Sequence, residues 1–309
     1  MALGSACHQA EVGVSLGHIL IINDGKAGHL NQSLGLAEAL AEQYPGLGIE
    51  KMRPLSRFRA LLALIFGWSP GGGQRPELII GAGHGTHLTL LALKRYWRVP
   101  IVVMMKPSVP LRLFDLCLIP EHDHPPNKFN VISTSGALNR VRPGEKRSGS
   151  GMILIGGPSK NSDWDELRLA RQVEALVNRV PCEWRLTTSR RTPASTLATL
   201  KNIKGVEVFP AEVTPDGWLP ENLAAAEQCW VTEDSVSMIY EALSAGCSVG
   251  VFEVPWRTEG RLLRGINKLK DRGVLTSYER WSGEPLPAPE YEFNEARRCA
   301  EIITERGLL

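Results

Sequence analysis

Short apolar runs alternate along the chain with stretches in which apolar residues recur at helical spacing. In the first half, the apolar runs predict five buried strands: His18–Asn23, Glu77–Ala82, Pro100–Met105, Leu116–Ile119 and Asn130–Ser133. Two intervening stretches, Ser33–Gln43 and Leu88–Arg95, have the period of helices. Strands that alternate with helices indicate an α/β fold built around a parallel sheet.

The same alternation restarts after a polar, glycine-containing stretch, Arg140–Gly151, which we interpret as a linker. Beyond it, apolar runs predict strands at Met152–Ile155, Glu183–Thr188, Val206–Phe209, Cys229–Thr232 and Ser248–Phe252. Helical spacing covers Asp163–Arg179, Ser235–Ala245, Gly260–Arg272 and Asn294–Arg306. We therefore expect two Rossmann-like domains facing a cleft, residues 18–140 and 151–280. A C-terminal helix within residues 290–309 is expected to cross back to the first domain.

Composition narrows the class of protein. The 309 residues are 43% hydrophobic and 22% charged, which excludes a disordered, collagen-like or coiled-coil chain. A net charge of +2 argues against a nucleic-acid binder, which normally carries a basic stripe. The six cysteines are scattered without a CxxC pair and are typical of reduced thiols in a cytosolic protein. No apolar run could span a bilayer, and Met1–Gly17 lacks the pattern of a signal peptide. We expect a cytoplasmic protein that at most lies on a membrane surface.

A glycine-containing turn follows the first predicted strand. It runs from Asp24 through Gly25, Lys26, Gly28 and His29 into a helix. Such a turn exposes backbone N–H groups at the positive end of the helix, which suits a phosphate. A histidine beside an aspartate adds a candidate general base. An ordinary strand-to-helix turn with a surface lysine explains the same residues equally well.

A second glycine turn, Gly81–His87, follows the next predicted strand and includes Gly83 and His84. Its three glycines permit close approach either by a ligand or by a neighbouring segment of the chain. A metal site built from His84, His87, His122 and His124 with Glu121 and Asp123 is disfavoured, because neither cysteines nor an HExxH-type spacing accompanies them. We therefore predict no metal ligands.

Polar turns in the second half also follow strands. Gly156, Gly157 and Ser159 come after the first strand, and Arg190 and Arg191 come after the second. Ligands of open α/β sheets bind at the carboxyl ends of strands. The arginine pair could neutralise a diphosphate, or could be an ordinary pair of solvated surface residues.

The segment Thr232–Gly246 combines a capped helix with one carboxylate inside it. Asp234 and Ser235 precede the helix, whose first turn offers free N–H donors. Glu241 lies among apolar residues, where an unpaired carboxylate is costly. Its partner is expected to be either a donor from the protein or the vicinal hydroxyls of a ligand, and the residues alone favour neither.

Five ordered segments carry a resemblance to a known family: DGKAGHLNQSLGLAEAL, FDLCLIPEHD, GALN, TTSRRTP and TEDSVSMIYEALSAG. Together they resemble the mitochondrial-fission (elongated-mitochondria) family, over about residues 18 to 275. Many bacterial members of that family are described as glycosyltransferases. The chain is also similar to GT-B glycosyltransferases, notably the lipid II-forming N-acetylglucosaminyltransferase. That enzyme has a glycine turn in place of Asp24–His29, and a glutamate five residues before a helix-ending glycine, as Glu241 precedes Gly246.

The resemblance implies a glycosyltransferase that moves a sugar from a nucleoside-diphosphate sugar to a cell-envelope or lipid-linked acceptor, without a cofactor. His29, with Asp24, would be catalytic. The implied donor-binding residues are Gly156, Gly157, Ser159, Arg190, Arg191, Asp234, Ser235 and Glu241, with Glu241 on the ribose hydroxyls. The implied acceptor-binding residues are Gly25, Lys26, Gly28, Gly83 and His84. Lys26-Ala27 departs from the enzyme's glycine pattern, which weakens the case for a lipid-diphosphate acceptor.

Two other functions fit the same scaffold. One is a non-catalytic interaction protein of the mitochondrial-fission type, and the other is a nucleotide-sugar epimerase or hydrolase. The fold does not decide between them.

The segment Arg53–Trp68 combines arginines with an apolar run and aromatic residues. Such a segment could dock on an anionic membrane, which would favour a lipid-linked acceptor and a peripheral location on the inner membrane. Because no polar-face periodicity is evident, the alternative of a buried core helix with a solvated basic start is favoured.

Overall fold

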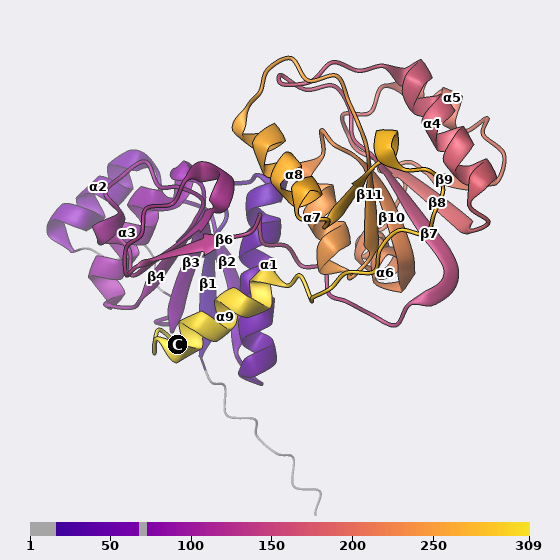
Figure 1. The fold of residues 1–309 in the computed structure, drawn as a ribbon. Coiled ribbons are helices and arrows are strands. Elements are labelled where there is room, and N and C mark those ends of the chain that lie inside the picture. Colours follow the sequence, from indigo (N-terminus) through magenta and orange to yellow (C-terminus); the bar gives the residue numbers. More distant parts are fainter. Residues whose placement is uncertain (1–16, 68–72) are drawn as a thin grey trace, which may run out of the picture.

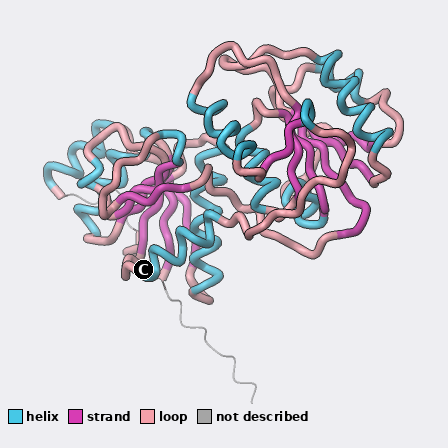
Figure 2. The backbone as a smooth tube through the Cα atoms, viewed as in Figure 1, coloured by secondary structure: helices cyan, strands magenta, loops and turns pink. Residues whose placement is uncertain are grey.

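The structure of the chain is a computed structural model that describes residues 17–67 and 73–309. The chain forms two α/β units, each built around its own six-stranded parallel sheet (Figure 1). Helices and loops surround both sheets (Figure 2). The predicted pair of Rossmann-like domains is therefore confirmed. The interpretation of Met1–Gly17 rests on residues outside the described range, as does that of Trp68.

The first sheet has the strand order β2-β1-β3-β4-β5-β6. Its strands are β1 His18–Ile22, β2 Gly48–Met52, β3 Leu78–Ala82, β4 Ile101–Met104, β5 Leu116–Pro120 and β6 Val131–Thr134. Its helices are α1 Ala27–Gln43, α2 Arg57–Phe66 and α3 His87–Trp97, with short 3-10 turns η1 His84–Thr86, η2 Leu111–Leu113 and η3 Glu121–Asp123. Strands β1, β3, β4 and β5 are buried throughout, because helices cover both faces of a parallel sheet. The edge strand β2 is mostly exposed, so no apolar run marks it.

The second sheet has the strand order β12-β11-β10-β7-β8-β9. Its strands are β7 Arg147–Ile155, β8 Glu183–Thr188, β9 Val206–Phe209, β10 Ala226–Thr232, β11 Ser248–Phe252 and β12 Leu275–Ser277. Its helices are α4 Glu166–Arg179, α5 Ala194–Leu200, α6 Trp218–Ala225, α7 Val236–Ser244 and α8 Arg261–Asp271, with the 3-10 turn η4 Tyr278–Arg280. The short elements α6 and β12 were not predicted.

Two predicted boundaries are wrong. Helix α1 begins at Ala27, not at Ser33, so Gly28 and His29 belong to its first turn. The predicted linker Arg140–Gly151 overlaps β7, which begins at Arg147. The polar start of β7 extends beyond the buried part of the sheet, and its residues Arg147–Gly149 are exposed. A polar composition is therefore not evidence of a loop at that position.

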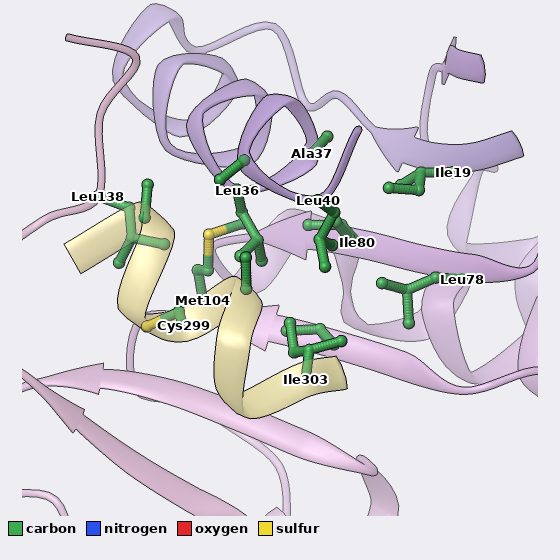
Figure 3. Packing of buried hydrophobic residues seen from close by; sticks show 14 of the residues in the cluster. Ile19, Leu36, Ala37, Leu40, Leu78, Ile80, Met104, Leu138, Cys299 and Ile303 are labelled. Carbon is green, nitrogen blue, oxygen red and sulfur yellow. The ribbon is translucent and has the colours of Figure 1, made fainter. Parts of the chain in front are cut away.

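The C-terminal helix α9 Glu295–Glu305 returns to the first domain, as predicted, and lies beside α1 (Figure 1). Cys299 and Ile303 of α9 join Leu36 and Leu40 of α1 in one core cluster above the sheet (Figure 3). All four side chains are fully buried. Burying this apolar area ties the end of the chain to the domain that begins it, at roughly 25 cal/mol per Å² of apolar surface.

Each sheet contains one place where the strand order reverses direction. In the first sheet it lies between β1 and β3, and in the second between β7 and β10. The loops after such neighbouring strands diverge to opposite faces and leave a crevice between them, where open α/β sheets bind ligands. We call these positions the N-switch and the C-switch.

Candidate functional site

The N-switch holds an aspartate–histidine pair. Nδ1 of His29 lies 2.9 Å from Oδ2 of Asp24, and both side chains are largely buried. Gly83, after β3, packs against the ring of His29 so closely that a Cβ at this position would overlap the imidazole. Its φ of 77° is also one that glycine adopts without strain. The two glycine turns predicted from the sequence therefore meet, and Gly83 is needed for packing against His29.

The first turn of α1 borders the same crevice. The first intrahelical bond runs from Leu30 N–H to Lys26 O, so the preceding amides of Ala27, Gly28 and His29 have no bonds within the helix. Gly28 lines the cleft between the domains. Unbonded amides at the positive end of a helix of 17 residues form a place suited to an anion.

The other predicted acceptor residues lie around this turn. Gly25 has a φ of 85°, and its N–H donates to Asn23 Oδ1 at 2.9 Å. The Lys26 N–H donates to Asp24 Oδ1, and its exposed ammonium lies 3.9 Å from Asp24 Oδ2. His84 is exposed on η1, and the structure records no side-chain hydrogen bond for it among the described residues.

The C-switch is closed by a buried aspartate. Oδ2 of Asp234 accepts from the Gly157 N–H at 2.9 Å and from Arg191 Nη2 at 2.8 Å. The Asp234 side chain is 0% exposed, and its Oδ1 has no partner within the described part of the chain. Gly156 packs directly on this carboxylate. The structure thus brings Gly156, Gly157, Arg191 and Asp234 together, with the Gly157 amide and the Arg191 guanidinium already bound to an internal anion.

The remaining residues predicted to bind the nucleotide-sugar donor do not lie together. Arg190 lines the interdomain cleft, whereas Arg191 turns to Asp234, so the two arginines do not form one clamp. The hydroxyl of Ser159 lies 2.8 Å from that of Ser162 and accepts from the Asn161 N–H, which makes it part of a local turn. Ser235 is buried at the start of α7, where its N–H donates to Thr232 O.

Glu241 faces the other domain across the cleft. Asn31 of α1 donates from Nδ2 to Glu241 Oε1 at 3.1 Å, although 210 residues separate them. Burial raises the pKa of Glu241 to about 7, against the opposing effect of the Asn31 hydrogen bond. Of the two kinds of partner that the sequence left open for Glu241, the structure shows a protein donor, the side-chain amide of Asn31 in the first domain.

The cleft between the domains has a volume of about 840 Å³. It is lined by α1, by residues 137–141 and by residues of the second domain that include Arg190, Ser237 and Glu241. This volume lies within the range of roughly 300 to 1,000 Å³ typical of small-molecule sites.

Two residues that the sequence did not single out, Asn31 and Asn139, join the domains. Asn139 donates from Nδ2 to Ser244 Oγ at 3.0 Å, and its backbone carbonyl packs directly on Gly35. The signal was present along α1, where Asn31, Gly35 and Glu38 follow one another at helical spacing. A polar and small helix face indicates a second surface packed against it.

His84, His87, His122 and His124 do not form one group in the described part of the chain. Among residues 17–67 and 73–309, no group of three or more His, Cys, Asp or Glu side chains is placed to hold a metal ion. His87 is buried instead, with Nδ1 3.3 Å from Ser108 Oγ, and burial lowers its pKa.

A sequence model described as Mitochondrial fission ELM1 matches residues 27–307. The chain belongs to the mitochondrial fission ELM1 family. One relative is the uncharacterized protein RP120 of Rickettsia prowazekii (strain Madrid E), 24% identical over 359 residues that cover 93% of this chain and 97% of that protein. Another is the mitochondrial fission protein ELM1 of Arabidopsis thaliana, 24% identical over 265 residues. They cover 68% of this chain and 61% of that protein.

Solved structures of other proteins share the fold. MurG of Acinetobacter baumannii has a TM-score of 0.51 at 11% identity, over 94% of this chain and 99% of that one. The UDP-GlcNAc 2-epimerase of Neisseria meningitidis, bound to UDP-GlcNAc, has a TM-score of 0.51 at 12% identity with the same coverage. At such identities the likeness shows the fold alone, and that fold is GT-B, as the resemblance implied.

Proposed function

We propose that this member of the ELM1 family is a glycosyltransferase. It binds a nucleoside-diphosphate sugar in the interdomain cleft and transfers the sugar to a cell-envelope or lipid-linked acceptor. The observation that carries the proposal is Glu241, a half-buried carboxylate in a cleft of about 840 Å³, to which Asn31 alone donates a side-chain hydrogen bond among the residues that the structure describes. A carboxylate of this kind can accept hydrogen bonds from the two vicinal hydroxyls of a ribose.

The N-switch supplies the chemistry that transfer requires. An acceptor hydroxyl must lose its proton as it attacks the sugar, and His29 would take that proton at Nε2 while Asp24 holds Nδ1. The unbonded amides at the start of α1 can stabilise negative charge on phosphate or acceptor oxygens. The proposed reaction uses the nucleotide sugar as substrate and needs no cofactor, so EDTA should leave the rate unchanged.

A thermal-shift screen against UDP-, GDP-, ADP- and CMP-sugars tests the donor site. One donor class should raise the melting temperature, and Glu241→Ala should abolish that shift. Ser237→Ala, on the same helix and cleft wall, is the control and should keep most of it. If no nucleotide sugar shifts the wild-type protein, the donor site does not exist.

The interaction-protein alternative is favoured by the C-switch. Gly157 N–H and Arg191 are bound to Asp234, so in this state they are not free to hold a diphosphate. Donor binding without turnover in wild-type protein, across acceptor fractions from cell envelopes, would support a non-catalytic scaffold. Conversion of the donor sugar in the absence of any acceptor would instead support an epimerase or hydrolase.

Helix α2 supports the lipid-linked acceptor. The interpretation of this segment as a buried core helix is wrong, because Ala60 and Ala63 are its only buried residues. Four of its large apolar side chains are instead exposed: Phe58 by 71%, Leu61 by 51%, Ile65 by 57% and Phe66 by 73%. Within residues 17–67 and 73–309, none of the helices combines the length and apolar character that crossing a bilayer requires.

The charge around this face favours an anionic membrane as its occupant. Arg57 and Arg59 are exposed in the first turn of α2, beside Phe58. Basic residues at the edge of an apolar helix face bind anionic headgroups while the apolar side chains enter the acyl boundary. Because α2 follows the carboxyl end of β2, its basic end lies at the sheet edge that carries Asp24. This arrangement supports our proposal that the protein lies on the cytoplasmic surface of an inner membrane.

Sedimentation with vesicles tests this docking. Vesicles rich in phosphatidylglycerol should carry the protein down, and pure phosphatidylcholine should not. The variant Phe58→Ser/Phe66→Ser and the variant Arg57→Glu/Arg59→Glu should both lose binding. The variant Leu167→Ser/Arg171→Glu, which makes the corresponding changes on α4, should keep its binding to the vesicles. Binding that survives the α2 changes would overturn the proposal.

A further inference from the structure

Helix α8 carries basic residues on two faces. Lys270 turns toward the second sheet, where its ammonium pairs with Glu233 and lies 3.6 Å from Glu253 Oε1. These two carboxylates follow β10 and β11, and all three side chains are largely buried. This ion network fixes the rotation of α8 on the carboxyl edge of the sheet.

The opposite face of α8 turns toward the first domain (Figure 1). Arg261, Arg264, Lys268 and Arg272 recur at intervals of three and four residues, so they form one stripe. The stripe lines a pocket of about 200 Å³ whose other wall includes Glu121, His122 and His124 of the first domain. Tyr240 lines this pocket, while the adjacent Glu241 lines the larger cleft.

The acidic residues of η3 neutralise only half of the stripe. Arg261 pairs with Asp123, and Lys268 pairs with Glu121. Within the described residues, no carboxylate lies within ion-pairing distance of Arg264 or Arg272. Burial raises the pKa of Tyr240 to about 12, so its phenol keeps its proton and can donate a hydrogen bond.

We propose that this pocket binds a phosphate-class anion, either inorganic phosphate or pyrophosphate or the phosphate end of a larger ligand. The planar fork of arginine matches phosphate oxygens in pairs, and two arginines here lack a carboxylate partner. A volume of about 200 Å³ is below the roughly 300 Å³ at which sites for larger small molecules begin. Because one wall of the pocket comes from each domain, the bound anion joins the two domains. It also competes with Asp123 and Glu121 for the basic side chains of α8.

Calorimetric titration of the full chain with inorganic pyrophosphate at low ionic strength tests the site. The wild-type protein should bind, and Arg264→Gln/Arg272→Gln should weaken binding about tenfold or more, as expected for lost charge-assisted hydrogen bonds. Both side chains are exposed, so the variant should fold. Arg257→Gln, which removes an exposed arginine paired with Asp163 elsewhere, is the matched control and should bind as the wild type does.

Removal of a carboxylate that competes with the anion for the basic stripe should raise the affinity for pyrophosphate. Glu121→Gln should strengthen pyrophosphate binding several-fold, whereas a merely structural ion pair would give no gain. Parallel titrations with inorganic phosphate and with UDP identify the source of the anion. Absence of binding in wild-type protein, or equal binding by the double variant, overturns the proposal. Glu241→Ala should leave pyrophosphate binding intact, so this result is independent of the donor site.

Discussion

An aspartate packs against a glycine of the neighbouring loop at both switch points, Asp24 against Gly85 and Asp234 against Gly156. At the N-switch the aspartate holds His29, whose second ring nitrogen has no protein partner among the described residues. At the C-switch the aspartate holds an amide and a guanidinium, and is itself fully buried.

An aspartate at the switch point of each sheet therefore has a different effect on its neighbours in the two domains. The carboxylate of Asp24 orients the His29 imidazole and leaves its Nε2 available, whereas that of Asp234 occupies the Gly157 amide and the Arg191 guanidinium. A diphosphate can use Gly157 and Arg191 only if they exchange Asp234 for the ligand. In the proposed reaction, the N-switch has its base in place, whereas the C-switch would have to rearrange before it holds a diphosphate.

Removal of the N-switch base should have the largest effect. His29→Ala should lower the turnover rate about 10²- to 10⁴-fold, the usual contribution of general base catalysis, while donor binding persists. Turnover and the donor-induced thermal shift are measured on the same protein. His84→Ala, an exposed histidine after β3, should lose less than about tenfold. Equal losses in the two variants would mean that His29 is not the base.

Glu241→Gln should stabilise the free protein and abolish donor binding. The folded-state pKa of Glu241, about 7, lies above its ordinary value of 4.5. The wild-type fold therefore loses stability as pH rises from the ordinary pKa through 7, since ionisation is disfavoured in the fold. Urea unfolding should show no advantage of the variant at low pH and an advantage of at most about 3 kcal/mol above pH 7. A difference in unfolding free energy that does not change with pH would contradict the raised pKa of Glu241.

Asp234→Asn tests whether the C-switch is closed by its own charge. The amide can still accept from Gly157 N–H, but it no longer repels a diphosphate, so donor affinity should rise about tenfold. Asp163→Asn, from an exposed aspartate–arginine pair, provides the control. Weaker donor binding in the Asp234 variant would show that this carboxylate organises the site instead of blocking it.

Asn31→Ala should have the smallest effect. Loss of its hydrogen bond raises the pKa of Glu241 further, so donor affinity near pH 7 should fall a few-fold, or about 1 kcal/mol. The midpoint of donor affinity against pH should move upward. Gln32→Ala changes a neighbouring residue of the same cleft wall and should leave that midpoint in place.

Much of the fold was predictable because it is local. Strands such as His18–Ile22 are continuous apolar runs, since both faces of their sheet are covered. The turns after β1 and β7 were predicted from their glycine residues alone. Prediction failed where the local signal was ambiguous: β2 is an exposed edge strand, β7 begins with polar residues, and α2 has apolar residues that are not buried.

The candidate site was predictable only as a set of separate segments. The sequence by itself determined which residues carry chemistry and that they follow strands, since spacing and turn residues encode local structure. Only the tertiary structure decided that Asn31 bonds Glu241, that Arg191 turns to Asp234 while Arg190 faces the cleft, and that Gly83 packs against His29. These pairings depend on how two sheets and the helices between them pack, and a periodic helix face shows that a second surface packs there without showing which residues that surface supplies.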